Sequence, residues 1–184
     1  MSVRVLVPLT HGFEEVEAVS MVDVMRRAGI DVVLAALETP LVVGANGITI
    51  KADAMLDEVM DEPFSMIALP GGHQGMMTLS SDPRVQSLLQ KYAQAGRYVG
   101  AICASPVALE KAGVLGDRFT CYPGYQAEIT GRDYLENEKV VVDGRVVTSR
   151  GPGTALCFGL EIVRLLVGEE VAAKLKDGML ISGC

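Results

Sequence analysis

Short apolar runs alternate with amphipathic segments along this chain, and no other feature limits its fold as strongly. The runs 3–7, 31–36, 66–69 and 98–102 are almost continuously apolar, which is typical of strands buried on both faces of a sheet. Helical periodicity is found between and after them, over residues 14–28, 83–95, 104–112, 153–167 and 169–176. This order predicts an α/β protein with a mostly parallel, doubly covered sheet, in a single domain spanning residues 1–184.

Two pairs of short strands carry hairpin turns, at Asn46-Gly47 and at Asp143-Gly144. In parallel sheets, ligands bind where the carboxyl ends of the strands meet. We expect four loops to converge at that edge: Leu9–Phe13, Gly71–Gly75, Cys103–Pro106 and Tyr122–Gly124.

Charge and hydropathy exclude several classes of partner. The 16 basic and 23 acidic residues give a net charge of -7, and no cluster of Lys and Arg occurs, so we expect neither nucleic acid nor an anionic membrane as a partner. No apolar run reaches the roughly 18 to 20 residues that cross a bilayer. Met1-Ser2-Val3 leads directly into a strand-like run without the features of a signal peptide, which predicts a cytoplasmic protein.

The four cysteines are widely spaced, and in a reducing compartment we expect all of them to be free thiols. We interpret Cys157 as a core residue and Cys184 as a free thiol near the chain end. Cys121, beside a loop of the expected ligand edge, is a candidate second redox thiol. With two histidines and no ligand cluster, no metal site is predicted.

Cys103 is the leading candidate for a reactive group. It lies directly after the run 98–102, among small residues that permit a tight turn from strand to helix, as in a nucleophile elbow. At the start of a helix, the dipole and free N–H groups would favour the thiolate. The alternative is a small buried hydrophobic residue, which is what most free cysteines are.

A carboxyl group on the first helix is the second candidate. On a helical wheel Glu17 shares the apolar face with Met21 and Val24, and burial there would raise its pKa and let it act as a proton donor. Glu14 also falls within the apolar arc and Glu15 lies at its edge, so periodicity alone does not choose between Glu14 and Glu17. All three could instead complement the helix N-terminus.

Backbone groups and two histidines complete the candidates. The N–H groups of Gly71-Gly72, with the amide of Ala104, could bind a developing oxyanion, although a paired glycine also marks an ordinary turn. His73 and His11 are each a candidate base for Cys103, and the alternative for each is a solvated loop residue.

Several of these segments, in this order, resemble the ThiJ/PfpI family, the superfamily of the parkinsonism-associated protein deglycase. They span almost the whole chain: Gly12-Phe13-Glu14-Glu15-Val16-Glu17, Val24-Met25-Arg26-Arg27-Ala28-Gly29-Ile30, Leu69-Pro70-Gly71-Gly72, Ala101-Ile102-Cys103-Ala104 and Thr148-Ser149-Arg150-Gly151-Pro152-Gly153-Thr154.

The resemblance implies a flavodoxin-like three-layer α/β/α sandwich, a homodimer, and no cofactor. It also implies that Cys103 is the nucleophile, that Glu17 rather than Glu14 is hydrogen-bonded to it, and that the amides of Gly72 and Ala104 line an anion pocket. Tyr122 stands where several relatives have a histidine, which argues against a protease triad unless His73 substitutes.

Two functions are therefore expected to compete. The first is a cofactor-independent enzyme that acts on small α-oxoaldehydes or glycation adducts through Cys103 and Glu17, of glyoxalase or deglycase type. The second is a non-enzymatic sensor of oxidative stress, or chaperone, in which Cys103 is oxidised. A cysteine hydrolase is a weaker third alternative.

Overall fold

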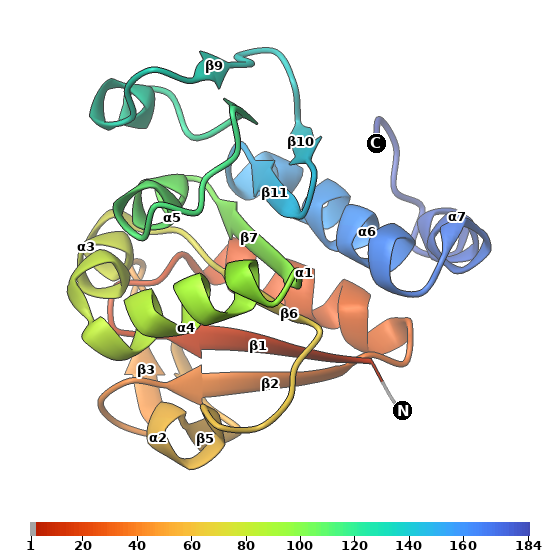
Figure 1. Ribbon diagram of the computed structural model, residues 1–184. Helices are drawn as coiled ribbons and strands as arrows, with labels where there is room; N and C mark the ends of the chain where they lie inside the picture. The colour runs from red at the N-terminus through yellow and green to blue at the C-terminus, as the bar shows by residue number, and fades with distance from the viewer. Residues whose placement is uncertain (1–2) are drawn as a thin grey trace.

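A seven-stranded sheet forms the centre of the computed structural model, which describes residues 3–184 (Figure 1). Met1 and Ser2, part of the N-terminal run considered above, lie outside the described residues. The strands of this sheet are β1 (Arg4–Leu9), β2 (Asp31–Ala36), β5 (Ala54–Met55), β6 (Met66–Leu69), β7 (Tyr98–Ile102), β10 (Val140–Asp143) and β11 (Val146–Ser149).

The strand order is β10-β11-β7-β6-β1-β2-β5, and every pair is parallel except β10 with β11. Taken as the first to fifth long strands, β1, β2, β6, β7 and β11 lie in the order 2-1-3-4-5, which is the flavodoxin-like arrangement. The order reverses between β1 and β6, so the loops after these two strands diverge and leave room for a site. The predicted mostly parallel α/β sheet is confirmed.

Helices cover both faces of the sheet, which completes three layers. On one face α1 packs against α6, and α7 packs on the outer side of α6. On the other face α3, α4 and α5 lie together over β6 and β7. The helix bounds are α1 (Glu15–Arg27), α2 (Leu56–Val59), α3 (His73–Ser81), α4 (Pro83–Gln94), α5 (Pro106–Lys111), α6 (Ala155–Leu166) and α7 (Glu169–Gly178).

Local sequence accounts for where these helices begin and end. The carboxylate of Asp82 accepts hydrogen bonds from the backbone N–H groups of Arg84 and Val85, and Pro83 occupies the first turn of α4. Gly29, with a φ of 79°, ends the first helix in a left-handed conformation. The start of α4 and the end of α1 therefore both follow from residues recognisable in the sequence.

Several elements differ from the sequence-based expectation. Helix α3 occupies part of the expected loop Gly71–Gly75, and η2 (Pro152–Thr154) precedes α6. Strand β8 (Arg118–Phe119) pairs with β9 (Asp133–Tyr134), and Cys121 lies outside both strands. The hairpin at Asn46-Gly47 forms as expected, from β3 (Leu41–Val43) and β4 (Thr49–Lys51).

The expectation of four free thiols is wrong for two of them. Cys157 on α6 and Cys184 form a disulfide, with their Cα atoms 5.2 Å apart, whereas Cys103 and Cys121 are free. Sequence spacing could not reveal the pair, because the chain after α7 turns back to α6 before it reaches Cys184. Over residues 3–184, no helix combines the length and apolar character needed to cross a bilayer.

Candidate active site

Cys103 lies at the carboxyl end of β7 on a sharp turn, as its flanking residues predicted. Its φ is 65°, a left-handed conformation that costs a residue with a side chain about 1 kcal/mol or more. The backbone holds this turn at both of its polar groups. The N–H of Cys103 donates to the carbonyl of Ser149 at 3.0 Å, and its own carbonyl accepts from the N–H of Tyr122 at 2.8 Å. Cys103 is 8% exposed, so it is buried but not sealed from solvent.

The turn is also fixed from below by a buried hydroxyl. Ser105 is fully buried and its Oγ donates to the carbonyl of Pro70 at 2.6 Å. This bond joins the loop after β7 to the loop after β6. The position of Cys103 is therefore tied to the loop that carries Gly71 and Gly72.

Glu17 on α1 places its carboxyl group against Cys103. The residue is fully buried, and its Oε2 accepts a hydrogen bond from the N–H of Gly71 at 2.8 Å. Oε1 of Glu17 is buried without a hydrogen-bond partner among residues 3–184, and the Cys103 thiol is the polar group beside this carboxyl. The site thus contains a thiol and a carboxyl group that are 86 positions apart in the chain but adjacent in space.

Burial dominates the ionisation of this pair. It raises the pKa of Glu17 to about 7; the negative charge of Glu14 acts in the same direction, while the Cys103 thiol and the hydrogen bond from Gly71 oppose it. Burial also raises the pKa of Cys103, with ionised Glu17 adding to the effect, whereas the N–H groups of Gly72 and Ala104 lower it. The helix start was expected to favour the thiolate outright, and burial overrides that expectation.

The ionisation of Cys103 is coupled to that of Glu17 as a consequence. The charge of Glu17 opposes the thiolate only while the carboxyl is ionised. A protonated Glu17 can instead donate to the sulfur, beside the N–H groups of Gly72 and Ala104. Negative charge at the sulfur is therefore favoured only when Glu17 carries the proton.

Two glycines are required by the space around the pair. A Cβ on Gly71 would lie 2.4 Å from Oε2 of Glu17 and 2.5 Å from Cβ of Cys103. Gly72 has a φ of 96°, and a Cβ there would lie 2.2 Å from the carbonyl oxygen of Gly12. The absence of a Cβ at both glycines therefore allows the close packing that keeps the amide of Gly72 next to the sulfur.

The structure separates the roles of the three acidic residues. The side chain of Glu14 caps α1 by accepting from the N–H of Glu17 at 2.8 Å, so Glu17, not Glu14, lies against the thiol. Glu15 is 4% exposed and binds the β3–β4 hairpin through the backbone N–H and side chain of Asn46 and the N–H of Ile48. This tether was not predicted, since a partner on a distant hairpin leaves no periodic signal.

The hydrogen bonds of the two histidines go to residues other than Cys103 and Glu17. Nδ1 of His11 accepts from the N–H of Val43, which ties this residue to the hairpin. His73 is exposed at the start of α3, and its Nδ1 is 2.8 Å from the hydroxyl of Tyr125. Tyr125, which the sequence did not single out, is near enough to the site that a charge on Cys103 raises its pKa, after the larger effect of burial.

A shallow hollow of about 300 Å³ borders the elbow and is lined by Tyr122, Pro123 and residues 150–154. Tyr122 is 46% exposed at its rim.

Cys121, by contrast, is fully buried, and burial raises its pKa to about 11, although the charge of Arg150 lowers it. The four predicted loops meet around Cys103, since contacts link Gly12, Gly71, Cys103 and Tyr122 in turn. Within residues 3–184, no group of three or more acidic, Cys or His side chains forms a metal site.

The sequence model of the DJ-1/PfpI family matches residues 3–165. The chain belongs to this family. Its DJ-1/PfpI relatives include Protein DJ-1 homolog A of Arabidopsis thaliana, 39% identical over 181 residues that make up 97% of this chain but 46% of that protein. The chain thus spans less than half the length of this relative.

Two further comparisons concern activity and fold. A Caenorhabditis elegans relative named glutathione-independent glyoxalase DJR-1.2 is 38% identical, over 85% of this chain and 84% of its own length. The crystal structure of Drosophila melanogaster DJ-1beta superposes with a TM-score of 0.96, at 36% identity and with 100% of both chains covered. The flavodoxin-like sandwich implied by the resemblance is therefore confirmed.

Proposed function

We propose that this chain is a cofactor-independent enzyme that converts small α-oxoaldehydes, or adducts formed from them, to hydroxy acids. The observation that carries the proposal is the buried pair of Cys103 and Glu17, with two backbone N–H groups directed at the sulfur. The name of the C. elegans relative supports this reaction class. Substrates of this class carry their own electrophile and electron sink, so a thiol and one proton carrier suffice.

The reaction would proceed by covalent catalysis. The sulfur of Cys103 adds to the aldehyde carbon, and the proton of the thiol passes to the new oxygen, which gives a hemithioacetal. Glu17 then removes the proton from this carbon and returns it to the neighbouring carbonyl carbon, so the first carbon is oxidised and the second reduced within one molecule. Water hydrolyses the resulting thioester, and methylglyoxal plus one water yields lactate.

The geometry supports each of these steps. The N–H groups of Gly72 and Ala104 can stabilise negative charge near the sulfur as the adduct forms. Because burial holds the pKa of Glu17 at about 7, its carboxyl group can both accept and donate a proton near neutral pH.

The test is methylglyoxal consumption with lactate formation, comparing wild type with Cys103→Ala and Glu17→Gln. We expect both variants to lose at least about 100-fold in kcat/KM, the usual range for a lost nucleophile or acid–base group. Cys121→Ala is the matched control, because Cys121 is also a buried free cysteine but lies outside the pair. Unchanged turnover in both site variants would exclude the mechanism.

A redox sensor is the second candidate function. It uses the same residues, since a protonated Glu17 and the two N–H groups would stabilise a sulfinate on Cys103 as well as an adduct. Dilute hydrogen peroxide distinguishes the two functions. Stoichiometric gain of two oxygens at Cys103 together with negligible aldehyde turnover would favour the sensor. A hydrolase is the weaker alternative, because His73 pairs with Tyr125 and Tyr122 carries no imidazole.

We also propose that two copies of this chain associate through α1 and the β3–β4 hairpin. Five apolar side chains are more than 40% exposed on these two elements: Val16, Val19, Leu41, Val43 and Ile48. Glu15 links the hairpin to α1, so they form one continuous face. Val16→Asp should convert a dimer to a monomer in sedimentation equilibrium, whereas Leu180→Asp, at a 90% exposed position elsewhere, should not. A wild-type monomer at all concentrations would refute the proposal.

A further inference from the structure

The chain after α7 reverses direction and returns to α6. Leu180 adopts a φ of 56°, and the N–H of Ile181 donates to the carbonyl of Lys176 at 2.9 Å. The half-buried side chain of Ile181 then packs against the hydrophobic core. We call residues 179–184 the closing segment, because it lies across the outer side of α6.

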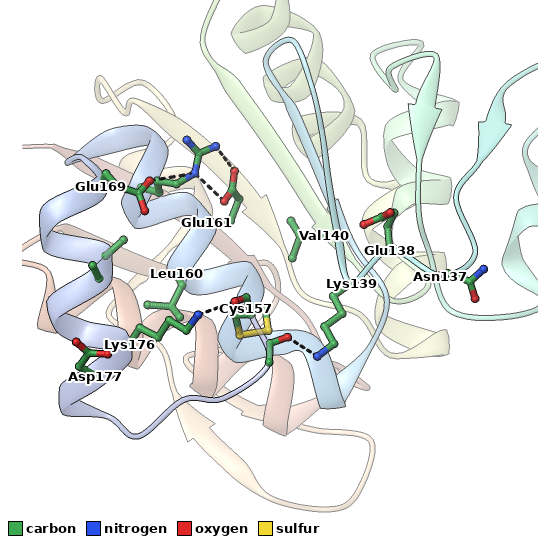
Figure 2. Close-up of a pocket in the computed structure, with 15 residues that line it drawn as sticks. Asn137, Glu138, Lys139, Val140, Cys157, Leu160, Glu161, Glu169, Lys176 and Asp177 are labelled. Carbon is green, nitrogen blue, oxygen red and sulfur yellow. Dashed lines mark hydrogen bonds and ion pairs between the residues drawn. A yellow bond between two sulfur atoms is a disulfide. The ribbon is translucent and has the colours of Figure 1, made fainter.

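Side chains from three elements hold the closing segment in place (Figure 2). Nζ of Lys176, on α7, donates to the backbone oxygen of Cys184 at 2.6 Å, and Nζ of Lys139, just before β10, donates to the carbonyl of Gly183. The third anchor is the disulfide from Cys184 to Cys157, in the first turn of α6. Polar contacts and a covalent bond thus converge on the last two residues of the segment.

A hollow of about 730 Å³ lies behind these anchors. Its walls are α6, α7 and residues 137–140, and Gly183 and Cys184 form one side of it. The disulfide is asymmetric in exposure, because Cys157 is 8% exposed whereas Cys184 is exposed. Cys184 is therefore the more accessible residue of the pair, and Cys157 is fixed in the first turn of α6.

We propose that Cys157 and Cys184 form a second redox site, independent of Cys103, which reversibly fastens the closing segment over this hollow. In the disulfide form the segment is fixed. In the dithiol form the segment keeps its backbone hydrogen bonds to α7 and the packing of Met179 and Ile181. Gly183 and Cys184 are then held by the solvent-exposed hydrogen bonds from Lys139 and Lys176, and exposed contacts of that kind contribute little. Reduction therefore releases Gly183 and Cys184 and opens the wall of the hollow.

The site would exchange with low-molecular-weight thiols and disulfides. The thiolate of Cys184 attacks a small disulfide, forming a mixed disulfide and releasing one thiolate. The Cys157 thiolate then attacks the Cys184 sulfur, forms the protein disulfide and releases the second thiolate. The protein dithiol loses two electrons and two protons, and the small disulfide becomes two thiols. Reduction is the reverse.

The experiment equilibrates the intact protein with glutathione and glutathione disulfide in varied ratios, followed by thiol alkylation, peptide mapping and hydrogen exchange. We expect a cross-link between the peptides containing residues 157 and 184 as the disulfide fraction rises. We also expect amide hydrogens in the closing segment to exchange at least about tenfold faster in the dithiol form than in the disulfide form. Cys184→Ser should exchange like the dithiol form under every ratio. Cys121→Ser, which alters a buried thiol elsewhere, should behave like wild type.

Three results would overturn the proposal. The first is the absence of the 157–184 cross-link at every ratio. The second is pairing of Cys184 with Cys103, with Cys121 or with another copy of the chain. The third is equal hydrogen exchange of the closing segment in the two redox forms. Because Cys103 takes no part in the readout, failure of this proposal can be distinguished from failure of the proposed aldehyde chemistry.

Discussion

Neutralising Glu17 should change how the stability of this protein depends on pH. Its pKa is raised to about 7 from an ordinary 4.5, with burial as the main cause. A carboxyl whose folded pKa exceeds its unfolded value binds its proton more tightly in the folded state, so the free energy of unfolding falls as pH rises through that interval. At about 1.4 kcal/mol for each pH unit, the loss between pH 4.5 and 7 is about 3 kcal/mol.

The variant that isolates this contribution is Glu17→Gln. Glutamine is neutral at every pH and keeps an oxygen for the N–H of Gly71. Urea unfolding from pH 4 to pH 8 gives the free energy of unfolding of wild type and of the variant. In the difference between the two, the contributions of the other titratable groups largely cancel. We expect the stability of wild type relative to the variant to fall by about 3 kcal/mol over this range.

Glu15→Gln is the matched control on the same helix. Burial would raise the pKa of Glu15, but hydrogen bonds from the Asn46 side chain and from backbone N–H groups outweigh it, and the pKa is lowered. Stability from Glu15 is therefore present above pH 4.5 and lost as pH falls, so its difference profile should have the opposite sign. A Glu17→Gln profile that is flat, or that runs like the Glu15→Gln profile, would refute the assignment of a buried, proton-holding carboxyl.

Three further predictions concern the surroundings of the pair. Gly71→Ala places a Cβ within 2.5 Å of atoms of both Glu17 and Cys103, so it should abolish aldehyde turnover and destabilise the fold by about 1–3 kcal/mol in urea. Gly178→Ala on α7, where a Cβ meets nothing within 4 Å, should do neither. Ser105→Ala leaves the carbonyl of Pro70 without its donor and should cost about 1–3 kcal/mol, and a smaller loss would mean that water replaces the hydroxyl. Cys121, fully buried and with a pKa raised to about 11, should react with iodoacetamide at pH 8 only as fast as the protein unfolds, which mass spectrometry can follow; rapid labelling would restore it as a candidate redox thiol.

Sequence periodicity predicted the sheet because each central strand is a continuous apolar run bounded by turn residues. It missed α3 (His73–Ser81), because Gly72 just before the helix and Gly75 within it resemble a loop. Tertiary contacts with Gly12 favour the helix instead. The elements β5 and α2 were too short for any period to emerge. Local pattern therefore determined the long elements, and packing determined the short ones.

The candidate site was predictable in part for the same reason. Cys103 was recognisable from local backbone demands, because only small neighbours fit its turn. Glu14 and Glu17 could not be separated by a helical wheel, since the difference depends on which carboxyl caps α1 and which crosses to the loop after β6. The disulfide depends on the reversal at Leu180, for which the sequence has no glycine to mark the turn.

Glu17 and Cys103 follow strands that are not neighbours, since β6 lies between β1 and β7. Strands two apart in a sheet are separated by roughly 9.6 Å, too far for a thiol and a carboxyl to meet unless the position between them is empty. Gly71 supplies that gap, and the floor of the site is consequently main chain rather than side chain. For the proposed reaction, we therefore expect changes in substrate preference to arise at the rim, at residues such as Tyr122, Tyr125 and His73, because the floor offers no side chain at Gly71 to vary.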